Sequence, residues 1–193
     1  AAHCKRRVAF VDTENGTDFY SIPNPSRAYH PEAFDFDAKY TRSLTEVLRE
    51  VKDLDPARHG VIVIDSMTHM WEAAKASYRG PTPGGKIPFW AWGGIKKPYK
   101  KLMAFLVDSP YHVLILGRQG NEFAEDEETG EAKAAGVKML AEGQTQYEPH
   151  VNVRMEAVKP RKKSAASHAV VTLFGEKDRS STIQGKVIEW PTF

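Results

Sequence analysis

The stretch Gly60-Val61-Ile62-Val63-Ile64-Asp65-Ser66 decides the fold, because an unbroken apolar run ends here in a carboxylate and a hydroxyl. A short β-branched run of this kind predicts a strand buried on both faces, at the centre of a parallel α/β sheet. Two similar runs, Arg7 to Val11 and His112 to Leu116, are followed by Asp12 to Gly16 and by Gly117 to Gln119. Ligands of such sheets bind beyond the carboxyl ends of the strands, so we expect all three strands to deliver polar groups to one edge.

Composition sets loose limits on the class of protein. The chain has 193 residues, of which 41% are hydrophobic and 27% charged, which suits one domain with a full core. The net charge of +2 does not argue for nucleic acid. The single cysteine, Cys4, excludes an internal disulfide framework and favours a reducing compartment. No apolar run reaches membrane-spanning length and no secretion signal is evident, so we expect a cytoplasmic protein with no membrane partner.

The segments between and after these runs predict an α/β order with a β extension. Apolar spacing predicts three helices, over 44–54 behind the capping box Ser43-Leu44-Thr45-Glu46, over 67–78 and over 96–107. Residues 17–40, 79–94 and 122–136 show no period and are predicted loops. Alternation predicts strands over 147–156 and 168–174. We therefore expect one core, with its α/β part in residues 1–145 and an antiparallel β extension in 146–193.

Three carboxylates that follow the predicted strands, Asp12, Glu14 and Asp65, are the candidates for chemistry. Hydrolysis of a nucleoside triphosphate needs one carboxylate for the magnesium-bound water and one to orient the attacking water. Asp65 suits the metal role and Glu14 the water role. The alternative is that Asp12 and Asp65 only cap the helices that follow them.

The ordered set of strands resembles the RecA-like ATPases, most closely the phage-encoded members associated with recombination and single-strand annealing. Val8 to Gly16 resembles the strand that carries the catalytic glutamate, and Val61 to Ser66 resembles the Walker B strand. His112 to Gln119 resembles the strand that ends in a nucleotide-sensing residue, and Gln146 to Ala157 the hairpin after the second DNA-binding loop. The match runs from about Arg6 to Gln184 and implies a mostly parallel RecA-like sheet flanked by helices.

The resemblance also implies a role for individual residues. Glu14 would polarise the attacking water, Asp65 would hold Mg²⁺ through water, and Ser66 would support that shell. Asp12 would lie in the same ATP site, and Arg118 or Gln119 would sense the γ-phosphate, although the family more often has an amide there. Lys177 and Arg179 resemble the basic pair that RecA-like filaments insert into a neighbour's nucleotide site. A solvated charged turn is the alternative for this pair.

The chain departs from the family in its phosphate loop. Gly80-Pro81-Thr82-Pro83-Gly84-Gly85-Lys86-Ile87 fits the spacing, but Ile87 replaces the magnesium-binding hydroxyl and no strand precedes the stretch. Such a loop works only where a strand delivers it to a helix N-terminus, so we treat the match as a decoy. The resemblance places the true loop and its helix just upstream of Val8, with Ala1 to Lys5 as the tail of that helix. Without the lysine and hydroxyl of a phosphate loop, residues 1–193 alone should bind nucleotide weakly.

Two irregular stretches correspond in position to the DNA-binding loops of the family. In the first, Arg79 to Gly94, aromatic side chains can stack on unpaired bases and basic ones can meet phosphates. The candidates there are Phe89, Trp90 and Trp92, with Arg79, Lys86, Lys96 and Lys97. The alternative is that the tryptophans form a local hydrophobic plug or a subunit interface. The second stretch, Asn121 to Gly143, is strongly acidic and argues against DNA unless only Lys133 and Lys138 engage.

These observations favour a RecA-like ATPase, of phage or prophage origin, that uses ATP and Mg²⁺ to act on single-stranded DNA in recombination or annealing. Self-association into a ring or filament is expected by resemblance. One rival is a non-hydrolysing nucleic-acid-binding or assembly protein on the same fold. The other is a magnesium-dependent nuclease with a two-metal site built from Asp12, Glu14 and Asp65. The seven histidines have no metal-binding spacing, and we interpret His69 as a packing or capping residue.

Overall fold

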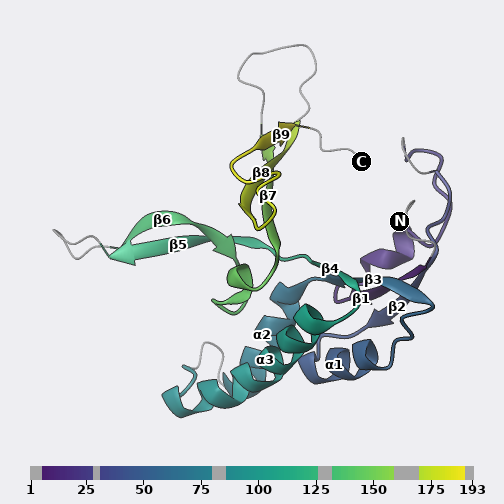
Figure 1. The fold of residues 1–193 in the computed structure, drawn as a ribbon. Coiled ribbons are helices and arrows are strands. Elements are labelled where there is room, and N and C mark those ends of the chain that lie inside the picture. Colours follow the sequence, from purple (N-terminus) through teal and green to yellow (C-terminus); the bar gives the residue numbers. More distant parts are fainter. Residues whose placement is uncertain (1–5, 28–30, 80–85, 126–131, 159–169, 190–193) are drawn as a thin grey trace. The chain divides into compact units, whose positions relative to one another are not determined.

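A four-stranded parallel sheet forms the centre of the first part of the chain (Figure 1). The structure is a computed structural model that describes residues 6–27, 31–79, 86–125, 132–158 and 170–189. Residues 1–145 and 146–193 form two compact units. The sheet order is β2-β1-β3-β4, with β1 at Arg7–Asp12, β2 at Phe36–Tyr40, β3 at His59–Asp65 and β4 at His112–Ile115. The predicted α/β class is confirmed, including antiparallel strands at the end of the chain.

The edge strand β2 corrects the prediction that residues 17–40 form a loop. A short 3₁₀ turn, η1 at Gly16–Phe19, follows β1, and the last five residues of the predicted loop pair in parallel with β1. The rings of Phe10 and Phe36 lie 5.8 Å apart across the two strands. Asp37 and Lys39 interrupt the apolar pattern of β2, which is why no strand was visible in the sequence.

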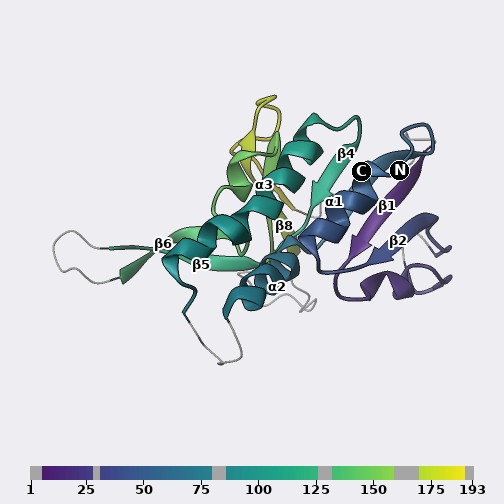
Figure 2. The same ribbon diagram turned by 90° about the horizontal axis from the view of Figure 1, so that it is seen from below.

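Three helices cover one face of this sheet, as Figures 1 and 2 show from two directions. They are α1 at Leu44–Lys52, α2 at Met67–Arg79 and α3 at Trp92–Asp108, with the 3₁₀ turn η2 at Phe89–Ala91 directly before α3. Ser43 caps α1 by accepting the Glu46 N–H at 3.3 Å, as the capping box predicts. Helix α3 begins four residues earlier than predicted and runs through Pro98.

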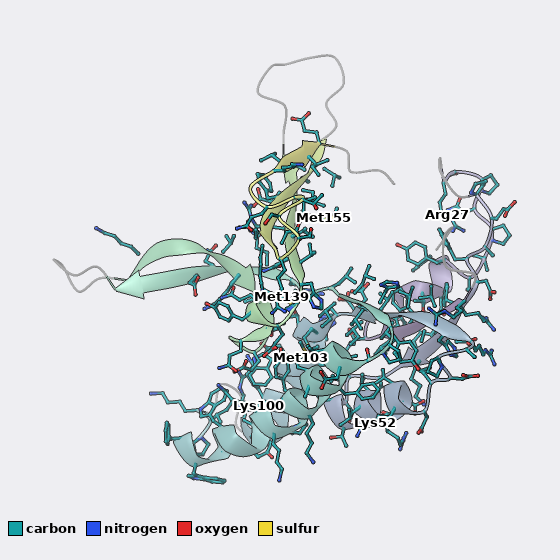
Figure 3. The ribbon with its side chains drawn as sticks, in the orientation of Figure 1. Arg27, Lys52, Lys100, Met103, Met139 and Met155 are labelled. Carbon is teal, nitrogen blue, oxygen red and sulfur yellow. The ribbon has the colours of Figure 1, made fainter. Side chains whose placement is uncertain are left out.

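The core lies between the helices and the sheet. Ile62 and Ile64 of β3 and Leu102 of α3 are fully buried there, and Met103 lies on the buried side of α3 (Figure 3). The opposite face of the sheet carries an apolar row: Val8, Phe10, Phe36, Val61, Val63 and Leu114. Within the described residues this row is only half-buried, and Leu114 is 51% exposed. The prediction that β3 is buried on both faces is therefore wrong for this face.

Two further β structures complete the chain. The predicted acidic loop is instead an antiparallel hairpin of β5 at Gln119–Glu125 and β6 at Ala132–Met139, whose tip lies outside the described residues. After the 3₁₀ turn η3 at Thr145–Tyr147, the second unit contains an antiparallel sheet of β7 at Val151–Val158, β8 at Val170–Asp178 and β9 at Val187–Glu189. In this sheet the Arg154 guanidinium lies 4.1 Å from the centre of the Phe174 ring.

Candidate functional site

The carboxyl ends of β1 and β3 meet at the point where the chain changes direction across the sheet. From β1 the chain passes to β2 on one side, whereas from β3 it passes to β4 on the other. Ligands of open α/β sheets bind in the crevice beyond such a switch point. The parallel register places Asp12 directly beside Asp65. The predicted site residues Asp12, Glu14, Asp65 and Ser66 therefore gather at one edge.

Asp12 holds the turn that follows β1. Its Oδ1 accepts the Glu14 N–H at 2.8 Å, and its Oδ2 accepts the Thr17 N–H at 2.8 Å and the Thr17 hydroxyl at 2.7 Å. Burial alone would raise the pKa of Asp12, but these hydrogen bonds outweigh burial and lower the pKa below its usual value. Because both oxygens are engaged in the turn, the expectation that Asp12 binds the cofactor is not supported. Asp12 instead positions the backbone that carries Glu14.

Thr13 fastens the ends of β1 and β3 together. Its N–H donates to the Asp65 carbonyl at 2.8 Å, and its hydroxyl lies 3.1 Å from the same oxygen. The Thr13 Oγ1 accepts the Ser66 N–H at 2.9 Å. The peptide bond between Asp65 and Ser66 is cis. These hydrogen bonds of Thr13, called the Thr13 clasp below, hold the turns that carry Glu14 and Ser66 together.

Glu14 projects from this clasp and contacts side chains from two other elements. Its Oε1 lies 3.1 Å from Nδ1 of His69, in the first turn of α2. Both of its carboxylate oxygens lie 3.3 Å from an Nη of Arg118, which follows β4. The glutamate side chain is 42% exposed, so it remains open to solvent while its direction is set from two sides.

Asp65 and Ser66 form the more buried half of the edge. Burial raises the pKa of Asp65, and the nearby charges of Glu14 and Asp12 raise it further, whereas His69 acts in the opposite sense. Ser66 is only 3% exposed, and its hydroxyl has no hydrogen-bond partner among the residues that the structure describes. A buried hydroxyl without a partner is costly, so this position favours a ligand or water at the edge.

The two candidate phosphate sensors differ in their surroundings. The Arg118 N–H donates to the Thr68 hydroxyl at 2.9 Å, which fixes the backbone of Arg118 against the start of α2. Gln119 is exposed and begins β5, where it pairs with Met139. The structure therefore brings the Arg118 side chain to Glu14, while Gln119 belongs to the hairpin.

The predicted basic pair Lys177 and Arg179 belongs to the second unit. The Lys177 ammonium donates to the Tyr147 carbonyl at 2.7 Å, and the Arg179 N–H donates to the His150 carbonyl at 3.0 Å. Arg179 is exposed at the end of β8. Their role at a neighbour's nucleotide site stays a prediction about an oligomer.

The predicted DNA-binding residues separate into an exposed group and a structural group. Phe89 and Trp90 are 94% and 80% exposed, and Arg79 and Lys86 are exposed as well. In contrast, the Trp92 ring lies 6.4 Å from the Trp71 ring and packs against the core. Trp92 is half-buried, which fits the alternative of a local hydrophobic plug, and its stacking on bases stays a prediction. Residues 80–85, most of the decoy phosphate loop, lie outside the described residues.

Lys96 is engaged by a buried carboxylate that the sequence did not reveal. Its ammonium lies 2.8 Å from Oε1 of Glu142, whose side chain is 3% exposed. Burial alone would raise the pKa of Glu142, but the contact with Lys96 and the N–H of Gln144 lower it overall. The Lys96 side chain is 41% exposed, so its contact with phosphate stays a prediction, and Lys97 and Lys100 are exposed on the same helix.

A cleft of about 680 Å³ lies beside these aromatic residues and Lys96. Its lining consists of four aromatic residues, two lysines, one glycine and a segment of three residues: Trp71, Phe89, Trp90, Trp92, Lys75, Lys96, Gly93 and 141–143. Trp71 and Trp92 form its packed wall, whereas Phe89 and Trp90 stand exposed at its rim. The cleft is an aromatic surface within the first unit, and it shares no lining residue with the Glu14–Asp65 edge, although α2 contributes to both.

No family model matches the chain, and no curated protein matches it either. Within the described part of the chain, no cluster of three or more His, Cys, Asp or Glu side chains could hold a metal ion by itself. None of the helices in that part is long and apolar enough to cross a membrane. Function must therefore be argued from the geometry of the edge and of the cleft.

Thr13 and His69 are the residues of this edge that sequence reasoning missed. Their contact joins positions 56 residues apart, and it exists because β1 and β3 are adjacent and in register. A usable signal was present, because His69 falls in the first turn of the helix that follows Asp65, where side chains can reach back to the strand ends. Our interpretation of His69 as a packing or capping residue omitted its contact with Glu14.

Proposed function

We propose that the chain is the core of a RecA-like ATPase that binds ATP with Mg²⁺ at the β1–β3 edge. The observation that carries this proposal is the meeting of Glu14, Asp65 and the unpartnered Ser66 hydroxyl at one switch point of the sheet. An exposed carboxylate beside a half-buried carboxylate and a buried hydroxyl provides two different roles within one site.

The residues at this edge fit a magnesium ion that is shared with phosphates. Mg²⁺ commonly uses one or two carboxylates, several waters and substrate oxygens, so it does not need a complete protein cage. The raised pKa of Asp65 reflects a carboxylate that is desolvated beside other negative charges, and a bound cation would relieve that cost. Asp65 would hold the ion through water, with the Ser66 hydroxyl supporting the same shell.

Within the described residues of the first unit, the second face of the sheet is only half-buried, which supports a further βα unit that carries the phosphate loop. Helix α1 connects β2 to β3, and α2 and α3 connect β3 to β4, all on one face. Both of these connections run across the sheet from the β2 side toward the β4 side. An additional strand beside β4, followed by a helix that leads to β1, would run across the sheet in the opposite direction. Because such crossovers are right-handed, its helix would lie on the opposite face, over the apolar row that includes Phe10, Val63 and Leu114. This unit would supply the phosphate-binding N–H groups that the Gly80 to Ile87 decoy does not.

When bound, Mg²⁺ would supply positive charge to the phosphate oxygens, with Asp65 and Ser66 as the residues that would hold it. The Glu14 carboxylate accepts a hydrogen bond from the attacking water and aims it at the γ-phosphate. The Arg118 guanidinium, now 3.3 Å from Glu14, is within reach of phosphate oxygens that enter the same edge. The Asp12 turn and the Thr13 clasp hold Glu14 and Asp65 at a fixed separation throughout.

Hydrolysis by the full-length protein tests this proposal. We expect Glu14→Gln to reduce single-turnover hydrolysis by about 100-fold or more, while affinity for a fluorescent ATP analogue changes by less than about 2-fold. Glu72→Gln is the matched control, because Glu72 is an exposed glutamate that pairs with Lys75 on α2. Equal hydrolysis by the Glu14 variant, or equal loss of binding and hydrolysis, contradicts the role of Glu14.

The structure favours the ATPase over the two-metal nuclease. A two-metal site needs Asp12 as a metal ligand, yet its oxygens already accept three hydrogen bonds from Glu14 and Thr17. Magnesium-dependent cleavage of DNA without ATP would reverse this preference. The non-hydrolysing rival predicts strand binding that is indifferent to nucleotide and to Glu14→Gln.

The same proposal gives the ATPase single-stranded DNA as its partner, at the aromatic cleft. The segment 67–108 carries seven basic and two acidic residues, whereas the whole chain has a net charge of +2. Phe89 and Trp90 can each stack on a base, which contributes roughly 1–3 kcal/mol per base. Positive charge beside exposed aromatic rings suits an unpaired strand better than a duplex.

Binding of a fluorescent oligonucleotide tests the cleft independently of hydrolysis. We expect Trp90→Ala to weaken binding by about 5- to 150-fold, the range that roughly 1–3 kcal/mol implies. Phe19→Ala is the control, because Phe19 is 75% exposed on η1 and does not line the cleft. Equal affinities of the wild type and both variants contradict base stacking at this site.

The same proposal includes assembly into a ring or filament through Lys177 and Arg179. It also includes action in recombination or annealing, in the cytoplasm of a bacterial or phage-infected cell.

A further inference from the structure

The contacts of His69 determine which of its ring nitrogens carries a proton. Nδ1 lies 3.1 Å from Oε1 of Glu14 and 3.0 Å from Oγ1 of Thr13. An ionised carboxylate only accepts hydrogen bonds, so a bare Nδ1 at this distance would place two lone pairs against each other. A proton on Nδ1 removes that conflict.

The Thr13 hydroxyl is consistent with the same assignment. It already accepts the Ser66 N–H at 2.9 Å, and its single proton can donate to the Asp65 carbonyl at 3.1 Å. With the Thr13 proton used in this way, the Nδ1 proton of His69 is shared between Thr13 and Glu14. The imidazole is thereby tied to the clasp on one side and to the carboxylate on the other.

The two groups that hold Glu14 are not equivalent. The Arg118 side chain is 59% exposed and lies 3.3 Å from the carboxylate, so this ion pair is solvated and weak. The His69 side chain is 17% exposed, makes the shorter contact and projects from the first turn of α2. Arg118 is therefore the partner that can leave Glu14, and His69 is the partner that stays.

We infer that His69 is a positioning residue for the catalytic carboxylate. It keeps Glu14 aimed over the Asp65 end of β3 while Arg118 turns to the phosphates. This inference rests on the proposed ATPase function and extends it to a residue outside the strand ends. A misplacement of about 1 Å in a catalytic group can cost about 100-fold in rate, so loss of this contact should reduce turnover more than binding.

Kinetics of the full-length protein provide the first test. We expect His69→Ala to lower kcat by about 10- to 100-fold, with affinity for an ATP analogue changed by less than about 2-fold. His69→Asn retains an N–H donor near the position of Nδ1 and should recover kcat to within about 3-fold of the wild type. His112→Ala, at an exposed histidine on β4, is the matched control and should hydrolyse ATP normally.

The protonation pattern of the ring provides a second test that does not depend on activity. Long-range ¹H–¹⁵N NMR spectra should show a proton on Nδ1 of His69 in the wild type. Glu14→Ala should shift the ring signals of His69, and Glu50→Ala, on α1, should leave them unchanged. A bare Nδ1, or ring signals that ignore Glu14→Ala, overturns the inference.

The failures of the two proposals are distinguishable. If the wild type hydrolyses ATP and His69→Ala retains its full kcat, the role of His69 is refuted while the ATPase stands. The same holds if His69→Asn is as slow as His69→Ala, because the donor at Nδ1 is then not what matters. If the wild type does not hydrolyse ATP at all, the proposed function is refuted and this role falls with it.

Discussion

Replacement of Asp12 tests whether this carboxylate holds a turn or a ligand. Asp12 is 2% exposed and accepts two backbone N–H groups and one hydroxyl. In Asp12→Ala the Thr17 hydroxyl can turn to Tyr40 Oη at 3.1 Å, so two N–H groups lose their acceptor. Each unsatisfied buried donor costs about 1–3 kcal/mol, which gives an expected loss of about 2–6 kcal/mol.

Urea unfolding of the full-length protein, followed by tryptophan fluorescence, measures this loss. The matched control is Asp35→Asn, because the Asp35 side chain is 79% exposed and pairs with Arg7 only at the surface. We expect the control to change the free energy of unfolding by no more than about 1 kcal/mol. A change of that size in Asp12→Ala would refute the turn-holding role and return Asp12 to the ligand-binding set.

The pH dependence of a second variant at this position, Asp12→Asn, adds an independent check. Because the pKa of Asp12 is lower in the folded state than its usual value of 3.8, its contribution is present above that pH. The contribution is lost as the pH falls through the lower, folded-state value. Asp12→Asn should therefore lose part of the acid sensitivity of the wild type. An unchanged acid profile would contradict the assignment.

Three further predictions concern stability. Hydrogen bonds from the backbone of Ile183 and the Ser180 hydroxyl lower the pKa of Asp178 to about 2, so the second unit should lose stability as the pH falls from about 3.8 toward about 2; circular dichroism of Asp178→Asn should show a flatter acid transition. Lys96→Ala leaves the buried Glu142 carboxylate without its cation and should lower the free energy of unfolding in urea by about 1–3 kcal/mol. The loss is moderate because the Lys96 side chain is 41% exposed, so the ion pair is partly solvated. The exposed control Lys97→Ala should lower it by no more than about 0.5 kcal/mol. Leu102→Ala should cost about 2–5 kcal/mol in the same assay because Leu102 is fully buried; an equal cost for Lys97→Ala, or none for Leu102→Ala, would contradict the packing described here.

The strands of the sheet could be predicted where hydrophobicity alone determines them. The runs at β1, β3 and β4 were located to within one residue at each end, because a strand packed against helices must be apolar. The strand β2 was missed because an edge strand tolerates the charged side chains of Asp37 and Lys39. The hairpin β5–β6 was missed because its pairing depends on the opposite strand and not on its own apolar period.

In the candidate site, only those residues could be predicted whose place follows from the local sequence. Glu14 and Asp65 were found because each follows an apolar run, which places it at the strand end. Their neighbours Thr13 and His69 act through contacts across the sheet, which depend on strand order and register. The contacts of Trp92 with Trp71 and of Lys96 with Glu142 were not predicted, because these partners are far away in the sequence.

The fastening of the strand ends also limits how the molecule can respond to a ligand. Thr13 binds the end of β3, the Met67 N–H donates to the Leu116 carbonyl, and the Arg118 N–H donates to Thr68. These links tie the carboxyl ends of β1 and β3 to the start of α2 and to the segment after β4. Arg118 is the last residue before β5. If ATP binds at this edge as proposed, a contact between its phosphates and the Arg118 guanidinium would act directly on the base of the β5–β6 hairpin, so a probe on that hairpin should respond to nucleotide.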